Sequence, residues 1–362
     1  MNLKEKIGQT FIVGLDVPYG KNMFKIIDRI ITEYKSGGIC LYRKNYNNYE
    51  QLVEVINYIK DKSSQEKVPI FIAIDQEGGR VNRIPNDFLN LPSSYKLAKY
   101  SSDKNNLVTS AGNITGKILK ELGFNMDFAP VLDIKRFSEN HAIGDRAYSE
   151  NPEEVALYGN EYIKGLKKSE IVSVVKHFPG HGATSKDSHF TLPKIEIGVE
   201  ELGKTDLIPF TKAIENGVDA ILIGHLVIKN ETKKLPATLS KRFITKYIRK
   251  KYRYNGLVIT DDMRMKAIKF SFLKIRNPIR LALNSGNDMV MFKYIGNEQK
   301  EIKKIEAEME KSINLARLNR KVNRILKIKE KYNVNTEQIK LNEEFRNKMN
   351  EEIKKIRKEC KI

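Results

Sequence analysis

Eight short, continuously apolar runs recur along the chain, each followed by a segment with helical spacing, and this alternation limits the possible folds most strongly. The runs are Phe11–Leu15, Gly38–Tyr42, Pro69–Ile74, Met126–Leu132, Ile171–Val175, Ala220–Ile223, Leu257–Thr260 and Met289–Phe292. Continuous apolar runs are typical of parallel strands that are covered on both faces. Eight strand–helix units in one chain predict the α/β class and, within it, a single-domain (β/α)8 TIM-type barrel.

The segments between the runs carry helix-start signals. Asn151 precedes Pro152 and two glutamates, and this order favours a helix because Asn caps the first turn and acids stabilise it. Ser240 opens a second helical pattern that ends before Gly256. A doubly wound open sheet is the alternative fold, but no G-x-G-x-x-G motif follows the first run.

The last stretch, residues 298–362, is helical in pattern and strongly charged. An apolar stripe persists to about Lys331, so this part can supply the eighth helix of the barrel. The stripe weakens beyond Asn333. We therefore expect the barrel over residues 1–332 and a solvated helical tail over residues 333–362.

Composition excludes several classes of protein. The net charge is +20, but the lysines are spread along the chain and no nucleic-acid-binding motif is present, so no nucleic-acid partner is expected. The sequence contains no run of 18 apolar residues, the length that a membrane-spanning helix needs. Phe11–Leu15 is too short for the core of a signal peptide. A cytoplasmic monomer is therefore expected. Two cysteines are too few for a disulfide framework or a cysteine zinc site.

Polar residues follow five of the predicted strands, at the end of a barrel where chemistry takes place. They are Asp75, Asp133, Lys176 with His177, His225, and Asp261 with Asp262. Each has a purely structural explanation: Asp262 could cap a helix, His225 could pack in the core, Arg80 could anchor a loop, and Gly78-Gly79 could form a tight turn. Their convergence on one end of the barrel favours a functional site.

The loop VVKHFPGHGATSKDSHFTLP, residues 174–193, allows two chemistries. A metal-dependent hydrolase could use His177, His181, Asp187 and His189 as ligands, although these residues form no helical i, i+4 pair. Metal-free glycosyl transfer needs a carboxylate and a proton carrier, which Asp261 and His189 could supply, with Asp187 orienting the histidine. A noncatalytic sugar-binding barrel is a third possibility, but binding alone needs neither Asp261 nor the Asp187–His189 pair.

Six motifs give the sequence a family resemblance. They are DQEGGRVNR (residues 75–83), FAPVLDI (128–134), IGDRAY (143–148), KHFPGHGATSKDSH (176–189), LPATLS (235–240) and GLVITDDMRM (256–265). Through them, the chain closely resembles the β-N-acetylglucosaminidases of glycoside hydrolase family 3. The motif KHFPGHG followed by D-S-H separates this branch from the β-glucosidases of the family.

The resemblance implies a retaining, exo-acting β-N-acetylglucosaminidase (a β-N-acetylhexosaminidase) that uses neither metal nor cofactor. Its expected substrates are peptidoglycan fragments with terminal β-linked GlcNAc, as in cell-wall recycling, with chito-oligosaccharides as the alternative. By resemblance, Asp261 is the nucleophile that forms a covalent glycosyl-Asp intermediate, and His189, paired with Asp187, is the acid/base. The residues implied to bind the sugar are Asp75, Arg83, Arg146, Lys176 and His177.

Overall fold

A parallel barrel forms the centre of the computed structural model, which describes residues 1–102, 106–137, 140–184, 192–269, 277–294, 302–304, 307 and 314–362. Its strands are β1 (Phe11–Gly14), β2 (Gly38–Cys40), β3 (Phe71–Ile74), β4 (Met126–Asp127), β5 (Val172–Phe178), β7 (Ala220–Ile223), β9 (Leu257–Thr260) and β10 (Val290–Lys293). They pair in the order β10-β1-β2-β3-β4-β5-β7-β9, and a parallel bridge between Ile259 and Met289 joins the two outer strands. The structure therefore confirms the predicted barrel, with one strand at each of the eight apolar runs.

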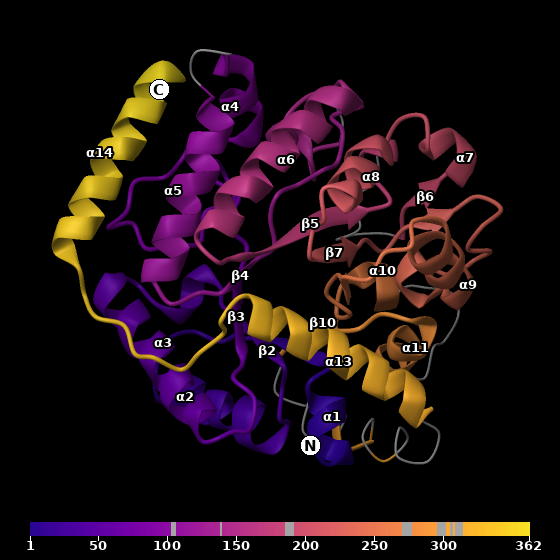
Figure 1. Cartoon of the computed structure of the whole chain (residues 1–362), viewed down its shortest axis with the longest axis horizontal. Helices are drawn as coiled ribbons and strands as arrows, with labels where there is room; N and C mark the ends of the chain where they lie inside the picture. Colours follow the sequence, from indigo (N-terminus) through magenta and orange to yellow (C-terminus); the bar gives the residue numbers. More distant parts are fainter. Residues whose placement is uncertain are drawn as a thin grey trace.

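Helices surround the strands (Figure 1). The α-helices are α1 (Leu3–Gly8), α2 (Lys21–Asp28), α3 (Tyr49–Ser64), α4 (Ser94–Tyr100), α5 (Leu107–Glu121), α6 (Pro152–Lys168), α7 (Val199–Leu202), α8 (Ile208–Glu215), α9 (Lys241–Phe243), α10 (Lys266–Lys269), α11 (Pro278–Ser285), α13 (Leu315–Lys331) and α14 (Glu343–Glu359). A separate small sheet pairs β6 (Lys194–Ile195) with β8 (Val227–Ile228). None of these helices is both long enough and apolar enough to cross a membrane; this finding covers the described residues.

Both predicted helix starts are present. The Asn151 side chain accepts a hydrogen bond from the Glu153 N–H at 2.9 Å, and α6 begins at the next residue, Pro152. The Ser240 hydroxyl accepts from the Phe243 N–H at 3.2 Å, and α9 follows it. The helix then continues as a π-helix, Ile244–Lys251. Local capping chemistry therefore fixes where these two helices begin.

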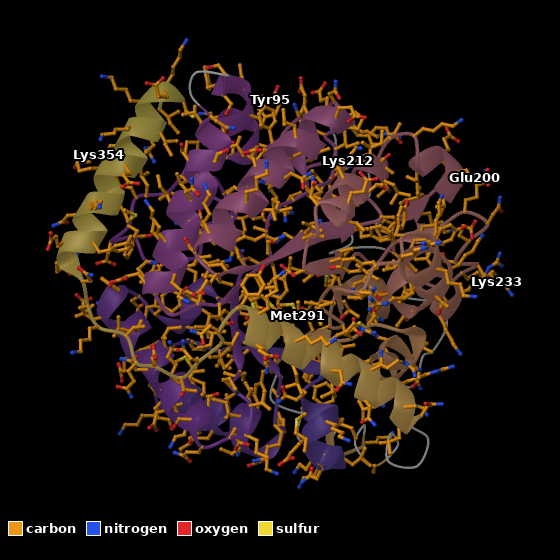
Figure 2. All side chains as sticks on the ribbon, viewed as in Figure 1. Tyr95, Glu200, Lys212, Lys233, Met291 and Lys354 are labelled. Carbon is orange, nitrogen blue, oxygen red and sulfur yellow. The ribbon has the colours of Figure 1, made fainter. Side chains whose placement is uncertain are left out.

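Alternate residues of each strand pack into two different apolar layers, which explains the continuous apolar runs. In β1, Ile12 faces the barrel interior, whereas Phe11 and Val13 pack against the helices. In β10, Met291 belongs to the interior layer and is 5% exposed. Figure 2 shows Met291 near the middle of the molecule, whereas Lys354 lies at its edge.

Helix α13 closes the N-terminal end of the barrel, which we call the floor. Its Ile325, Ile328 and Tyr332 side chains pack with the interior layer of the strands. Lys331 Nζ lies 2.7 Å from the carboxylate of Asp219, the residue just before β7. The sequence indicated that this segment can supply the eighth helix of the barrel; in the structure, the apolar stripe of α13 covers the open end of the barrel.

The C-terminal helix α14 packs along α5 (Figure 1). Met349, Ile353 and Ile356 on one side of α14 are buried. The side chain of Asn350 accepts from the Leu89 N–H at 2.7 Å and donates to the Asp87 carbonyl at 2.9 Å. The expectation of a solvated tail is therefore wrong, because even a narrow stripe of three apolar residues is enough to seat a helix on its neighbour.

Candidate active site

The C-terminal ends of the strands form the mouth of the barrel, and a buried network of ion pairs connects the loops after β3 and β4 with β5. Lys176 Nζ lies 2.7 Å from Asp75 Oδ1 and 2.7 Å from Glu77 Oε1. Arg146 binds the Glu77 carboxylate with two nitrogens, each at 2.7 Å. The network brings together three predicted sugar-binding residues, Asp75, Arg146 and Lys176, through Glu77.

The charged state of this network follows from its pairing. Burial by itself would raise the pKa of Glu77, but the charges of Arg146 and Lys176 outweigh it and hold that pKa well below its usual value. Burial would lower the pKa of Lys176, and the carboxylates of Asp75 and Glu77 raise it instead. Both residues are therefore ionised at neutral pH. The Asp75 side chain is 23% exposed, against 4% for Lys176, so Asp75 is the member of the pair open to a ligand.

Asp133 fixes the position of His177. Asp133 Oδ2 lies 2.6 Å from His177 Nδ1, and Asp133 Oδ1 accepts from the His181 N–H at 2.6 Å. The Asp133 side chain is fully buried; burial would raise its pKa, but the neighbouring His177 and His181 outweigh burial and hold that pKa below its usual value. An ionised acceptor at Nδ1 requires a proton on that nitrogen, which leaves His177 Nε2 as the second ring nitrogen for a ligand.

Asp261 follows β9 directly, and its backbone and side chain are both held. Its N–H donates to the Ile223 carbonyl of β7 at 3.0 Å. Its Oδ1 accepts from the Asp262 N–H at 2.7 Å. The carboxylate of Asp262 accepts from the N–H groups of Arg264 and Lys293, at 3.0 and 3.2 Å, so it bridges the turn after β9 to β10. The candidate nucleophile therefore lies on a rigid part of the mouth.

His225 supports this turn from below and is completely buried. Its Nε2 lies 3.0 Å from the Asp262 carbonyl oxygen, which can only accept, so Nε2 donates. Its Nδ1 then accepts from the Thr238 hydroxyl at 2.9 Å. Burial lowers the pKa of His225. Of the two roles considered for His225, the structure supports the packing role and gives it a neutral, buried imidazole.

Arg83 approaches the mouth from another side. Its N–H donates to Gln76 Oε1 at 2.8 Å, and its carbonyl accepts from the Tyr46 hydroxyl at 2.8 Å. Arg83 lines a hollow of about 580 Å³ together with Tyr42 and Arg43 from the loop after β2. The structure thus does not bring Arg83 into the ion-pair network of Lys176, but places it at the rim.

Arg80, Gly78 and Gly79 have the structural roles that the sequence suggested for them, a loop anchor and a tight turn. Arg80 Nε pairs with Asp145 at 3.0 Å, and its Nη2 donates to the carbonyls of His141, Ala142 and Ile143. Gly78 and Gly79 have φ angles of +82° and +53°, and form the turn that returns the chain after Glu77. Arg80 is therefore a loop anchor that ties the segment after β3 to the segment before Arg146.

Asp187 and His189, the predicted acid/base pair, lie outside the described residues. The described start of their loop is anchored: Asn140 Nδ2 donates to the carbonyls of His181 and Thr184, at 3.2 and 2.8 Å. A Cβ on Gly182 would meet the Ile134 carbonyl oxygen at 2.1 Å, so glycine is required for this close approach. Two of the four candidate metal ligands, His177 and His181, are described, and both are tied to Asp133.

Sequence reasoning assigned no role to Glu77 and treated Asp133 only as one of several strand-end residues. Both are buried carboxylates that hold predicted binding residues, Glu77 through Lys176 and Arg146, and Asp133 through His177. The signal for Glu77 was its i, i+2 spacing from Asp75 behind a strand end. Its partners could not be read from that spacing because they come from two distant segments.

The fold and these residues define a barrel whose mouth holds paired carboxylates, basic groups and a histidine in fixed positions, which is an arrangement typical of barrel enzymes. Residues 2–328 match the family described as "Glycosyl hydrolase family 3 N terminal domain". The chain therefore belongs to glycosyl hydrolase family 3, and it is a glycoside hydrolase.

Named relatives agree with this assignment. A protein of Tolumonas auensis named "Beta-hexosaminidase" is 35% identical over 256 residues, which cover 70% of this chain and 75% of that protein. A protein of the same name from Xanthomonas axonopodis pv. citri is 31% identical over 285 residues, covering 78% of this chain and 82% of the relative. The solved structure of a family 3 β-N-acetylglucosaminidase from Paenibacillus sp. str. FPU-7 superposes with a TM-score of 0.89 at 31% identity, covering 99% of this chain and 69% of that one.

Proposed function

We propose that the protein is a retaining, exo-acting β-N-acetylglucosaminidase that removes terminal β-linked GlcNAc. The observation that supports this most directly is the position of Asp261: it follows β9 at the mouth, in a family 3 barrel whose relatives are named β-hexosaminidases. One hydrogen bond from the Asp262 N–H holds the Asp261 carboxylate, and another holds the Asp261 backbone against β7, so the carboxylate is suited to attack at a fixed point.

In the proposed reaction, Asp261 attacks the anomeric carbon while His189 protonates the leaving oxygen, so that a covalent glycosyl-Asp forms and the aglycone departs. His189 then takes a proton from water, and the water oxygen displaces Asp261 with net retention at the anomeric centre. Asp187 orients the imidazole of His189. Neither step requires a metal or a cofactor.

The sugar is proposed to be held by the charged groups at the mouth. Asp75 and His177 offer an acceptor and a ring nitrogen to hydroxyl groups, and their own partners, Lys176 and Asp133, keep them in place. Two arginines complete the proposed sugar-binding residues. Arg146 belongs to the ion-pair network, and Arg83 lies at the rim of the mouth. Fixed polar partners of this kind discriminate between sugars, because a missing substrate hydroxyl leaves a buried group unpaired.

Specificity and metal dependence can be tested in one assay with aryl β-GlcNAc and aryl β-glucoside. We expect the first substrate to be cleaved far faster, with full activity in EDTA. Loss of activity on chelation and its return with zinc would support the metal-dependent alternative instead. Saturable binding of GlcNAc without any turnover would support a noncatalytic sugar-binding barrel.

The acid/base role can be tested with His189→Ala. Because a general acid matters most for a poor leaving group, this change should slow cleavage of a GlcNAc disaccharide much more than cleavage of a nitrophenyl glycoside. Azide should speed the variant and yield a glycosyl azide. His141→Ala, which alters an exposed histidine on another loop, is the control. Equal slowing of both substrates, without azide rescue, would assign His189 to binding.

The natural substrate is proposed to be a peptidoglycan fragment, as in cell-wall recycling, with chito-oligosaccharides as the alternative. A cytoplasmic location and a monomeric state belong to the same proposal. Comparison of kcat/KM for a GlcNAc–MurNAc peptide and for chitobiose separates the two substrate classes. A preference for chitobiose would transfer the proposal to chitin fragments.

A further inference from the structure

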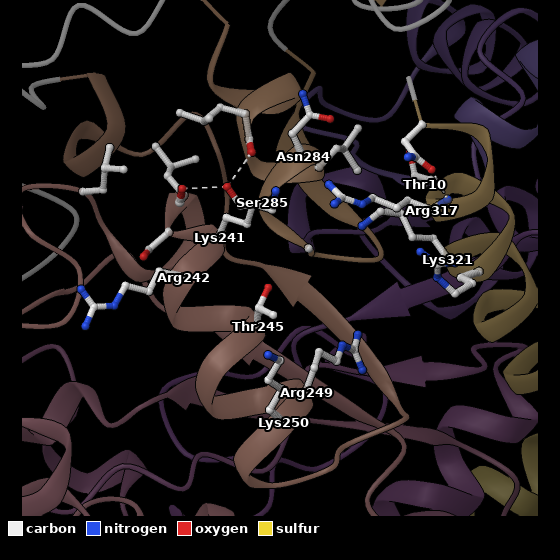
Figure 3. Close-up of a pocket in the computed structure, with 18 of the residues that line it drawn as sticks. Thr10, Lys241, Arg242, Thr245, Arg249, Lys250, Asn284, Ser285, Arg317 and Lys321 are labelled. Atoms are coloured by element: carbon white, nitrogen blue, oxygen red, sulfur yellow. Dashed lines mark hydrogen bonds between the residues drawn. The ribbon is translucent and has the colours of Figure 1, made fainter. Parts of the chain in front are cut away.

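A cavity of about 1100 Å³ lies along the outside of the barrel (Figure 3). One wall is the helical segment 241–251, and the opposite wall is α13. Thr10, which precedes β1, and Gly286, which precedes β10, also line it. None of the described candidate active-site residues lines the cavity, so it is separate from the candidate active site.

The lining of this cavity is much more basic than the chain as a whole. Nine of the 24 described lining residues are Lys or Arg, whereas 65 of all 362 residues are. Glu231 is the one acid among those 24. Eight of the nine basic residues come from two short segments, 241–250 and 317–324, which the fold places on opposite walls. The resulting field attracts anions.

Seven of the nine basic residues fall into two groups, and the other two, Lys233 and Lys250, are exposed at the edge of the set. Arg249 and Arg324 both pair with the buried Asp288, at 2.5 and 2.9 Å, and Lys321 donates to the Asn287 carbonyl. Burial and the neighbouring arginines lower the pKa of Lys321 to about 8. These three side chains are fixed in place by protein partners.

The second group is available to a ligand. It consists of Lys241 and Arg242 on one wall and Arg317 and Arg320 on the other, and all four are exposed. Within the described ranges, their side chains form no ion pair with an acid. Figure 3 shows Lys241 and Arg242 on the helical segment and Arg317 across the cavity on α13. An anion between the walls could therefore be bound from both sides.

The cavity also has an apolar surface. Five leucines line it, namely Leu235, Leu239, Leu281, Leu283 and Leu318. The combination of apolar and basic groups matches an organic anion better than an inorganic ion, and the volume is that of a site for one small molecule. Arginine is also the side chain best suited to paired hydrogen bonding with phosphate oxygens.

We propose that this cavity binds an organic polyphosphate of nucleotide size, at a site distinct from the mouth of the barrel. The phosphate groups lie between Arg317 and Arg320 on α13 and Lys241 and Arg242 on the opposite wall. The organic part of the ligand contacts the leucines. A duplex nucleic acid is too wide for a cavity of this volume, which favours the small ligand.

The experiment is calorimetric titration of the full chain with ATP, and separately with inorganic tripolyphosphate, in 0.1 M salt. ATP should bind at one site and more tightly than tripolyphosphate. The double variant R317Q/R320Q should weaken ATP binding at least about tenfold, since it removes two charge-assisted partners. K241Q/R242Q should do the same from the opposite wall. The matched control K348Q/K355Q removes two exposed charges from α14 and should leave binding unchanged.

Several results would overturn the proposal. These are the absence of a saturable site, equal weakening by the control, equal affinity for tripolyphosphate and ATP, or displacement of ATP by GlcNAc, which would move the site to the mouth. Tighter binding of a short RNA than of ATP through the same residues would identify a nucleic-acid surface instead. Melting temperatures equal to that of the unmodified protein establish that each variant is folded.

Discussion

At the mouth of the barrel, Lys176 lies between the carboxylates of Asp75 and Glu77, whereas at the floor Asp288 lies between Arg249 and Arg324. Both ends thus bury a charge between two opposite charges. At the mouth, Asp75 remains 23% exposed and can meet a ligand. At the floor, the Asp288 side chain is 0% exposed and also accepts from the Val258 N–H. Exposure and unused hydrogen-bonding capacity, rather than charge, separate a site from a structural network.

The largest difference between the mouth and the floor is expected for Asp261→Asn, a change at the mouth that should lower activity and not stability. We expect kcat to fall by about three orders of magnitude or more, because the amide cannot form the glycosyl ester. The melting temperature should change little. Glu150→Gln, an exposed carboxylate outside the mouth network, is the control and should keep full activity. Early NMR detection of an inverted product would remove Asp261 from the role of nucleophile.

Asp288→Ala, a change at the floor, should instead lower stability and leave activity unchanged. It leaves two arginines beside an empty position, and breaking a buried pair in this way costs about 3–5 kcal/mol of unfolding free energy. Turnover per folded molecule should stay unchanged, since Asp288 is at the floor. Urea unfolding and active-site titration measure the two quantities. A large loss of kcat without loss of stability would show that the two ends are coupled.

A third test uses pH. Burial lowers the pKa of Lys329, on α13, to about 7, whereas the pKa of Lys176 is raised. At Lys329 the unfolded chain therefore binds more protons than the folded protein between about pH 7 and pH 10.5, and this residue makes stability rise with pH in that window. Between pH 7 and 9.5, the unfolding free energy of the unmodified protein should rise by about 2–3 kcal/mol more than that of Lys329→Met. Lys327→Met, an exposed change on the same helix, is the control; equal slopes in all three proteins would contradict the prediction.

The smallest effect is expected from Thr238→Val, which deprives His225 Nδ1 of its donor. Because His225 positions the turn that carries Asp261, kcat should fall about tenfold while KM stays nearly constant. Thr238→Ser keeps the hydroxyl and should restore kcat. If the serine variant is as slow as the valine variant, the lost group is the methyl, and the role of Thr238 is packing.

The sequence predicted the barrel well because each strand carries its own signal. Runs such as Ala220–Ile223 and Leu257–Thr260 are apolar on both faces, and their positions in the fold match the prediction. Their positions at strand ends also predicted that Asp75, Lys176 and Asp261 lie at the same end of the barrel, because a parallel barrel gathers those ends at one side.

The parts that sequence reasoning missed depend on which neighbour covers a surface. An apolar stripe on α13 shows that one face is buried, but the same stripe would suit the outer ring or the floor. The weak stripe of Met349, Ile353 and Ile356 was similarly insufficient to predict contact with α5. Pairing of Glu77 with Arg146 joins residues 69 positions apart, and only the closed barrel brings them together.

Helix α13 follows all eight barrel strands in the chain, and this order has a consequence for synthesis on the ribosome. Until residues 325–334 emerge, the interior residues that they cover, such as Phe71, remain open to water at the floor. A nascent chain that ends with β10 therefore has all eight barrel strands but lacks the residues that cover the floor. The floor can be covered only after α13 has been made, and α13 also joins the segment made first, through Lys329 and Gln9.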